Sequence, residues 1–230
     1  MGVFFIDTEF NNGNFYLGDI FEIACLSSNN RLFHTYINIQ TDIPVYIQRM
    51  CGLNTSLIKQ APYFNEAMDN LIKFISLDED YKTQTILIGH GGRLSDYPLL
   101  LANCIKNRYD YNCLKNYKFV DSMEGFRESG YRRPGLDSLL SYQRNIHSAK
   151  EDVQLLRNIV TSHKNIRYKL FTYNEIFNHL CEKMPVTISD IRKQVKTKGN
   201  LEQYLRKYVK EKTALNRKQL WKIVNRYSFE

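Results

Sequence analysis

Acidic residues at three places in the chain could together hold a divalent cation. The first place is Asp7-Thr8-Glu9, directly after the apolar run 3–6. On a β-strand, side chains two positions apart project from the same face, so the two carboxylates would lie side by side. Neighbouring anions repel each other and are costly to bury unless a cation joins them. The spacing indicates a metal site, although a solvated strand end would also explain it.

The second place is the segment from His147 to Val153. Ser148 and Glu151 have the spacing of a capping box, which predicts that Ser148 is the N-cap of a helix. His147 would then precede the helix and Asp152 would be its fourth residue. These two positions lie against each other in the hydrophobic-staple geometry, so imidazole and carboxylate could meet. The alternative is an ordinary capped helix with an incidental histidine.

The third place is Asp96, which follows the glycine-rich stretch 89–92 and opens an expected helix. A strand that feeds such a loop could deliver Asp96 to the carboxyl edge of a sheet. A plain N-cap is the alternative role for this residue.

Taken together, these places supply four carboxylates and one histidine. Oxygen donors without thiolates or paired histidines suit Mg²⁺ or Mn²⁺ better than zinc. Two divalent ions would balance four negative charges, and ions held roughly 3.5–4 Å apart clamp a phosphoryl group during in-line displacement. The acids in question are Asp7, Glu9, Asp96 and Asp152.

The elements that must position these residues indicate an α/β fold. A three-stranded meander is expected over 3–6, 16–26 and 32–39, with later strands over 85–88 and 117–120. Helical spacing occurs over 44–59, 65–76 (with Asn65 as cap), 96–106, 135–143 and 149–162. Strands followed by alternating helix and strand predict a mixed β-sheet flanked by helices.

The C-terminal part differs in charge and pattern. Residues 1–159 carry 16 Lys and Arg against 18 Asp and Glu, whereas residues 160–230 carry 16 against 6. Beyond about residue 165 strand signals stop, and helices are expected over 173–184, 188–197, 201–212 and 217–227. We therefore predict a domain over 1–165 and a small basic helical domain or tail over 166–230. Such a basic segment favours a polyanionic partner, unless its helices simply pack against the core.

Composition excludes several classes of protein. Asp7 interrupts the N-terminal apolar run, so a signal peptide is not expected, and no stretch approaches the roughly 18 apolar residues of a membrane span. The five cysteines are odd in number and form no C-x-x-C pair. We therefore expect an intracellular protein, cytoplasmic or nuclear, that is neither secreted nor membrane-bound. Abundant Asn, Lys, Tyr and Ile are typical of an A/T-rich genome, such as a viral one.

Three segments resemble the motifs of the DEDDh exonucleases, which have the ribonuclease H-like fold. Residues 5–10 (FIDTEF) resemble the first motif, and residues 147–153 (HSAKEDV) resemble the third. Residues 89–100 resemble the middle motif of the TREX-like (three-prime repair exonuclease) branch. Gly91 stands there where Asn is usual, and Ser95 where an aromatic residue is usual. The resemblance covers roughly residues 3–160 and also includes Gly52-Leu53-Asn54.

This resemblance implies a metal-dependent 3′→5′ exonuclease that releases nucleoside monophosphates. His147 would be the general base that takes a proton from the attacking water, a role that suits an imidazole. Two ions, Mg²⁺ or Mn²⁺, would be held by Asp7, Glu9, Asp96 and Asp152. The terminal nucleotide would contact Thr8, Phe10 and Leu53, for which core packing is the alternative.

The resemblance also implies a nucleic-acid partner with a single-stranded or frayed 3′ end. DNA is expected more than RNA, because the middle motif is TREX-like. An exoribonuclease of the same fold and a non-catalytic nucleic-acid-binding protein remain alternatives. The sequence leaves the oligomeric state open, with a homodimer among the options. Truncation after about residue 165 is expected to spare the chemistry and to weaken binding of long substrates.

Overall fold

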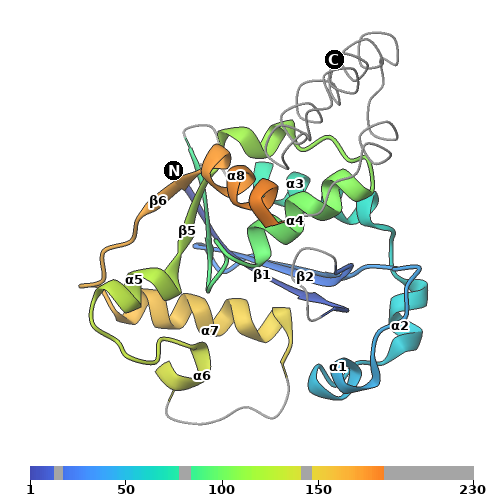
Figure 1. Ribbon diagram of the computed structural model, residues 1–230, viewed down its shortest axis with the longest axis horizontal. Coiled ribbons are helices and arrows are strands. Elements are labelled where there is room, and N and C mark those ends of the chain that lie inside the picture. Colours follow the sequence, from blue (N-terminus) through green and yellow to red (C-terminus); the bar gives the residue numbers. More distant parts are fainter. Residues whose placement is uncertain (13–17, 78–83, 141–146, 184–230) are drawn as a thin grey trace, which may run out of the picture.

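The computed structural model describes residues 1–12, 18–77, 84–140 and 147–183 (Figure 1). Within them lies one six-stranded sheet, of order β3-β2-β1-β4-β5-β6. The strands are β1 (Gly2–Phe10), β2 (Ile20–Ser27), β3 (Leu32–Tyr36), β4 (Thr85–Gly89), β5 (Lys118–Asp121) and β6 (Leu170–Thr172). β4 and β5 continue the sheet in parallel with β1, while β2, β3 and β6 each pair antiparallel to a neighbour. The predicted mixed sheet is confirmed.

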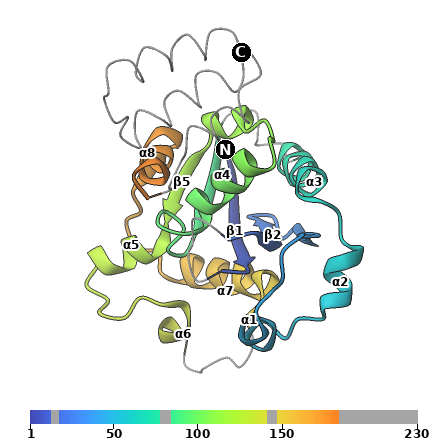
Figure 2. The same cartoon turned by 45° about the vertical axis from the view of Figure 1, so that its right-hand side comes forward.

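Helices cover both faces of the sheet (Figures 1 and 2). They are α1 (Val45–Met50), α2 (Thr55–Gln60), α3 (Phe64–Ser76), α4 (Asp96–Lys106), the 3₁₀ helix η2 (Asn112–Asn116), α5 (Ser122–Glu128), α6 (Leu136–Leu139), α7 (Ala149–Ser162) and α8 (Tyr173–Lys183). α3, α4 and α8 lie on one face, and α7 lies on the other. Among the described residues, no helix is both long enough and apolar enough to cross a membrane.

The alternation of side chains along β1 decides which face each residue serves. Phe4 and Ile6 are buried in the larger core, with α3, α4 and α8. Phe5 is buried in a smaller cluster on the other side, with Val153 and Leu156 of α7. Because the alternation continues to the end of the strand, Asp7 and Glu9 face the α7 side and Thr8 faces the α4 side.

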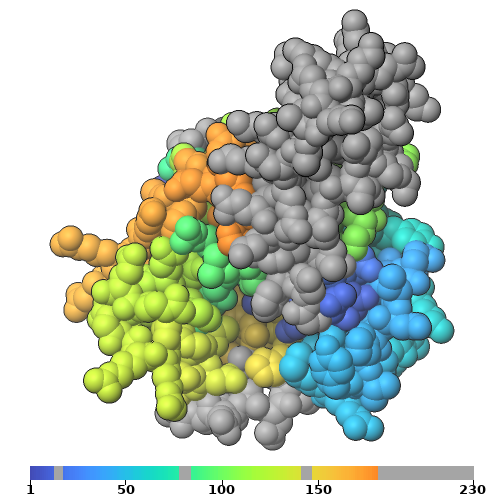
Figure 3. Space-filling view, in the orientation of Figure 1, coloured from blue at the N-terminus to red at the C-terminus, as the bar shows by residue number. Residues whose placement is uncertain are grey.

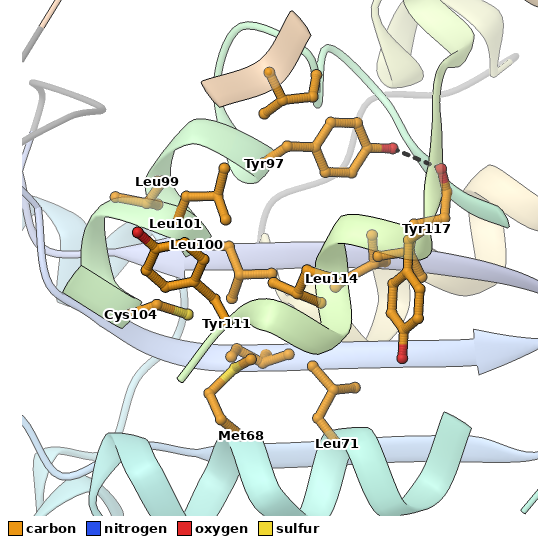
Figure 4. Close-up of a cluster of buried hydrophobic side chains, with 14 of the residues drawn as sticks. Met68, Leu71, Tyr97, Leu99, Leu100, Leu101, Cys104, Tyr111, Leu114 and Tyr117 are labelled. Carbon is orange, nitrogen blue, oxygen red and sulfur yellow. Dashed lines mark hydrogen bonds between the residues drawn. The ribbon is translucent and has the colours of Figure 1, made fainter. Parts of the chain in front are cut away.

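Tyr97, the second residue of α4, anchors that helix to the sheet (Figure 4). Its buried hydroxyl lies 3.0 Å from the carbonyl oxygen of Leu87 and 2.6 Å from that of Val120. The glycine-rich loop packs closely on its ring, since a Cβ added at Gly92 would lie 2.9 Å from the ring carbon Cζ. This packing places the start of α4, and therefore Asp96, at the carboxyl ends of the central strands.

Three helix predictions differ from the structure. The helix expected over 135–143 is only α6, which ends at Leu139 because Leu140 adopts an extended conformation (φ −93°, ψ 155°). The helix expected over 44–59 is instead α1 and α2, because the chain turns between them at Gly52, where φ is +57°. A left-handed residue cannot continue a helix, and glycine adopts this conformation without steric cost. Asn65 is not the cap of α3: Tyr63 occupies the N-cap position, and the Asn65 amide donates to the carbonyl oxygen of Asn107.

The chain after residue 165 contributes to the sheet, so the prediction that strands end there is wrong. β6 pairs with β5, and its Phe171 lies in the larger core with Tyr173 and Phe177 of α8. A strand of three residues is too short to show a period, which explains why the sequence did not reveal it. β6 and α8 therefore pack with the sheet, through side chains up to Leu180. The helices expected over 188–227 lie outside the described residues.

Candidate metal centre

Three of the four candidate carboxylates meet at the end of β1. Asp7, Glu9 and Asp152 each offer an oxygen, and these three atoms lie within 4.8 Å of one another. Asp7 and Glu9 share one face of the strand, and Asp152 reaches them from the first turns of α7, which packs across β1 and β2. Asp152 is buried, with 7% of its surface exposed. Three carboxylates this close repel one another unless a cation neutralises them, and their hard oxygens suit Mg²⁺ or Mn²⁺.

Asp96 approaches the same strand from the opposite face. Its Oδ1 accepts hydrogen bonds from the hydroxyl of Thr8 (2.7 Å) and from the backbone N–H of Thr8 (3.1 Å), and its Oδ2 accepts from the Ser95 hydroxyl (2.8 Å). Burial raises the pKa of Asp96, while these bonds partly offset the effect. Asp96 is not among the three residues whose oxygens lie within 4.8 Å. It is next to the acidic group, and Thr8 joins it to the strand.

α7 begins where the sequence predicted, but its capping box does not form. Ser148 is the N-cap residue, with φ −151° and ψ 130°, yet its side chain makes no capping bond. Its hydroxyl donates instead to Oε1 of Glu22, over 3.1 Å. The donated bond turns the side chain towards Glu22, a buried carboxylate 126 residues earlier in the chain, and the Ser148 oxygen accepts no bond from the first turn of α7.

His147 lies directly before this helix and beside the end of α1. Its backbone N–H donates to the carbonyl oxygen of Met50, over 2.9 Å. The space-filling view shows the same neighbourhood, with the start of α7 in yellow against the light blue α1 segment (Figure 3). The His147 side chain is half-buried. α1 therefore holds the backbone of His147 at the N-terminus of α7, the helix that carries Asp152.

Glu22 and Cys51 belong to this region, although neither lies in a motif that predicts it. Glu22 stands directly opposite Glu9 in the β1–β2 pairing and is only 1% exposed. The sequence did contain a signal, because Glu22 is the only charged residue of β2, which is apolar apart from Glu22 and Ser27. The thiol of Cys51 lies 3.7 Å from Oε2 of Glu9. Burial, followed by the negative charge of Glu9, raises the pKa of that thiol.

Asp121, also missed from the sequence, holds the glycine-rich loop in place. Its carboxylate accepts hydrogen bonds from the backbone N–H groups of Gly91 (2.9 Å) and Arg93 (3.2 Å). It is also the N-cap of α5, where it accepts from the N–H of Glu124. The loop that leads into α4 is therefore bound to the end of β5. A loop-binding acid at a strand end has no sequence signature of its own.

The residues expected to contact a terminal nucleotide have packing partners in the protein. Phe10 is half-buried against the larger core, and Leu53 packs against a separate cluster around α1 that includes Phe21 and Ile47. The hydroxyl of Thr8 is bound to Asp96. Their part in substrate binding stays a prediction.

The sequence matches no protein-family model, and no curated protein matches it. Solved structures do match the fold. One is a 3′-exonuclease described in 3′-end-specific recognition of a histone mRNA stem-loop, with 16% identity, a TM-score of 0.61, and coverage of 75% of this chain and 91% of the other. Another is the nuclease domain of 3′hExo, a DEDDh family member bound to rAMP, with 17% identity, a TM-score of 0.61, and coverage of 73% and 96%.

A third similar structure is cell-death related nuclease 4 (CRN-4), with 10% identity, a TM-score of 0.59, and coverage of 74% of this chain and 66% of that one. At such low identities the likeness is one of fold. The expected ribonuclease H-like architecture is confirmed, and the structures that share it include 3′-exonucleases of the DEDDh family.

Proposed function

We propose that this chain is a metal-dependent 3′→5′ exonuclease that hydrolyses nucleic acid to nucleoside monophosphates. The observation that carries the proposal is the convergence of Asp7, Glu9 and Asp152 within 4.8 Å at the end of β1. A protein that only binds nucleic acid has no need of three crowded carboxylates, which cost free energy in the absence of a cation. The fold shared with 3′-exonucleases supports the same activity.

Asp7, Glu9 and Asp152 would hold Mg²⁺ or Mn²⁺ directly, as a set of hard oxygen donors. Asp96 would complete a site for a second ion, since it adjoins the strand through Thr8. A bound divalent cation would supply neutralisation of the negative charge that develops on the scissile phosphodiester. The carboxylates of the chain would determine the position of that cation.

His147 would accept the proton of the attacking water. An imidazole can take a proton near neutral pH, and here its backbone is held by Met50 at the start of α7. Phe10 and Leu53 would offer apolar surface to the terminal base or sugar, which suits sequence-tolerant contact. The basic residues of the C-terminal segment would follow the phosphate backbone, so binding should weaken with added salt.

DNA is the proposed substrate, on the resemblance of residues 89–100 to the TREX-like middle motif. A second candidate is an exoribonuclease of the same fold. It is favoured by the similar structures, since one is described with a histone mRNA stem-loop and another with rAMP.

The test uses purified full-length protein and matched DNA and RNA oligonucleotides labelled at the 5′ end. With Mg²⁺ or Mn²⁺, progressive shortening of the labelled strand is expected, together with release of monophosphates and faster loss of DNA. A chelator, Asp7→Ala or His147→Ala should stop this shortening. Faster decay of RNA would favour the exoribonuclease. Activity that is equal in wild type and Asp7→Ala would identify a contaminant and refute the proposal.

A further inference from the structure

Glu22 is a buried carboxylate that the proposed reaction does not use. It lies in β2, is 1% exposed, and stands directly opposite Glu9 in the antiparallel pairing of β1 with β2. Side chains of directly opposite residues project from the same face of a sheet. Glu22 therefore faces α7, on the side of the sheet that carries Asp7 and Glu9.

Glu22 has two polar partners from distant parts of the chain. Its Oε1 lies 2.8 Å from Nε2 of His34 on β3 and accepts a hydrogen bond from the hydroxyl of Ser148, over 3.1 Å. The His34 ring in turn packs edge-on against Tyr36, with centroids 5.2 Å apart. The carboxylate thus links the edge of the sheet to the N-cap of α7.

The bond from Ser148 replaces the usual role of an N-cap serine. Such a serine ordinarily accepts a hydrogen bond from the first turn of its own helix, but Ser148 makes no side-chain capping bond. Its hydroxyl ties the start of α7 to the sheet instead. Ser148 lies between His147 and α7, the helix that carries Asp152. The hydrogen bond from Ser148 to Glu22 therefore holds the chain next to His147 and at the start of α7.

We propose that Glu22 is a positioning residue that sets the start of α7 against β1 through Ser148. By this contact it places Asp152 against Asp7 and Glu9, and it orients His147 beside them. Reactions of this kind depend on placement to within a fraction of an ångström. The inference rests on the proposed function for its activity readout, whereas its metal-binding readout is independent of substrate.

The experiment compares full-length wild type with Glu22→Ala, Ser148→Ala and Ser148→Thr. Asp69→Asn is the matched control, because Asp69 accepts a bond from the Tyr109 hydroxyl on the exposed side of α3, over 2.9 Å. Mn²⁺ affinity is measured by calorimetry, and kcat and KM are measured on a labelled oligonucleotide.

Loss of a partner that orients metal ligands typically costs about 10–100-fold in affinity or activity. Glu22→Ala and Ser148→Ala should therefore lose about 10–100-fold in Mn²⁺ affinity and in kcat, with KM little changed. Ser148→Thr keeps a hydroxyl and should restore both values to near those of wild type. Asp69→Asn should behave as wild type.

Wild-type Mn²⁺ affinity and kcat in folded Ser148→Ala would overturn the inference, and this variant decides the matter if Glu22→Ala fails to fold. A loss in Ser148→Ala that Ser148→Thr does not restore would also overturn it. If wild type degrades no nucleic acid, yet Ser148→Ala loses Mn²⁺ affinity and Ser148→Thr regains it, the positioning role stands and the nuclease proposal fails. Absence of Mn²⁺ binding in wild type would refute both.

Discussion

The hydroxyl of Thr8 donates to Oδ1 of Asp96 over 2.7 Å, and the backbone N–H of Thr8 donates to the same oxygen. Thr8 stands between Asp7 and Glu9 in sequence, but its side chain points to the opposite face of β1. One strand therefore presents two carboxylates to α7 and binds a third carboxylate, from α4, through the residue between them. The strand is the common support of both halves of the acidic site.

Thr8→Val should destabilise the protein by about 1–3 kcal/mol, because it removes a buried donor from the Asp96 carboxylate. Valine has nearly the same shape as threonine, so the change tests the hydrogen bond more than the packing. Thr8→Ser keeps the hydroxyl and serves as the control. Urea unfolding in the presence of a chelator measures both variants. Greater loss of stability in Thr8→Ser than in Thr8→Val would show that the methyl group, not the bond, is important.

Asp152→Asn should remove most of the stabilisation that the protein gains from Mn²⁺. For wild type, Mn²⁺ at about 100 times its Kd should raise the free energy of unfolding by about 2.7 kcal/mol. Glu151→Gln is a matched control, since Glu151 is the exposed neighbour of Asp152 on α7 and is not one of the three clustered acids. Thermal unfolding with Mn²⁺ and with a chelator provides the comparison. Equal stabilisation of Asp152→Asn and wild type would place the cation elsewhere.

His90 should make the protein less stable in acid. Burial lowers its pKa from 6.5 to about 4, so the folded protein favours the neutral ring. The free energy of unfolding is therefore highest above about pH 6.5, the pKa of histidine in the unfolded chain. It decreases as the pH falls towards 4, because the unfolded chain then binds a proton that the folded protein does not. A shift of this size corresponds to about 3 kcal/mol.

The measurement for His90 is the free energy of unfolding of wild type and His90→Gln between pH 7 and pH 4. Glutamine does not titrate, so the difference between the two proteins should change in favour of the variant as the pH falls. A difference that stays constant over this range would mean that the ring titrates alike in both states.

Truncation after residue 165 should unfold the protein, contrary to the expectation from sequence. It removes β6 and α8, whose buried side chains Phe171, Phe177 and Leu180 belong to the larger core. Truncation after residue 183 keeps every described element and should leave a cooperative unfolding transition. Circular dichroism melting of both fragments distinguishes these outcomes. A cooperative transition in the 1–165 fragment would show that β6 and α8 are dispensable.

Local patterns in the sequence determined much of this fold. The period of two in β1 was enough to place Asp7 and Glu9 on one face, and the helix over 149–162 was predicted with the bounds observed. Such features depend on residues a few positions apart, whose spacing fixes the direction in which side chains point. The order and type of the candidate acids could be identified for the same reason.

Only the tertiary structure decided which partners these residues meet. The Ser148 hydroxyl binds Glu22 rather than its own helix, Asp96 binds Thr8, and a three-residue β6 joins the sheet. In each case the partners are far apart in the chain. Which of them pair depends on the distances between them after the helices have packed on the sheet. A hydroxyl or carboxylate is satisfied by the best acceptor or donor within reach, and reach is a property of the folded chain.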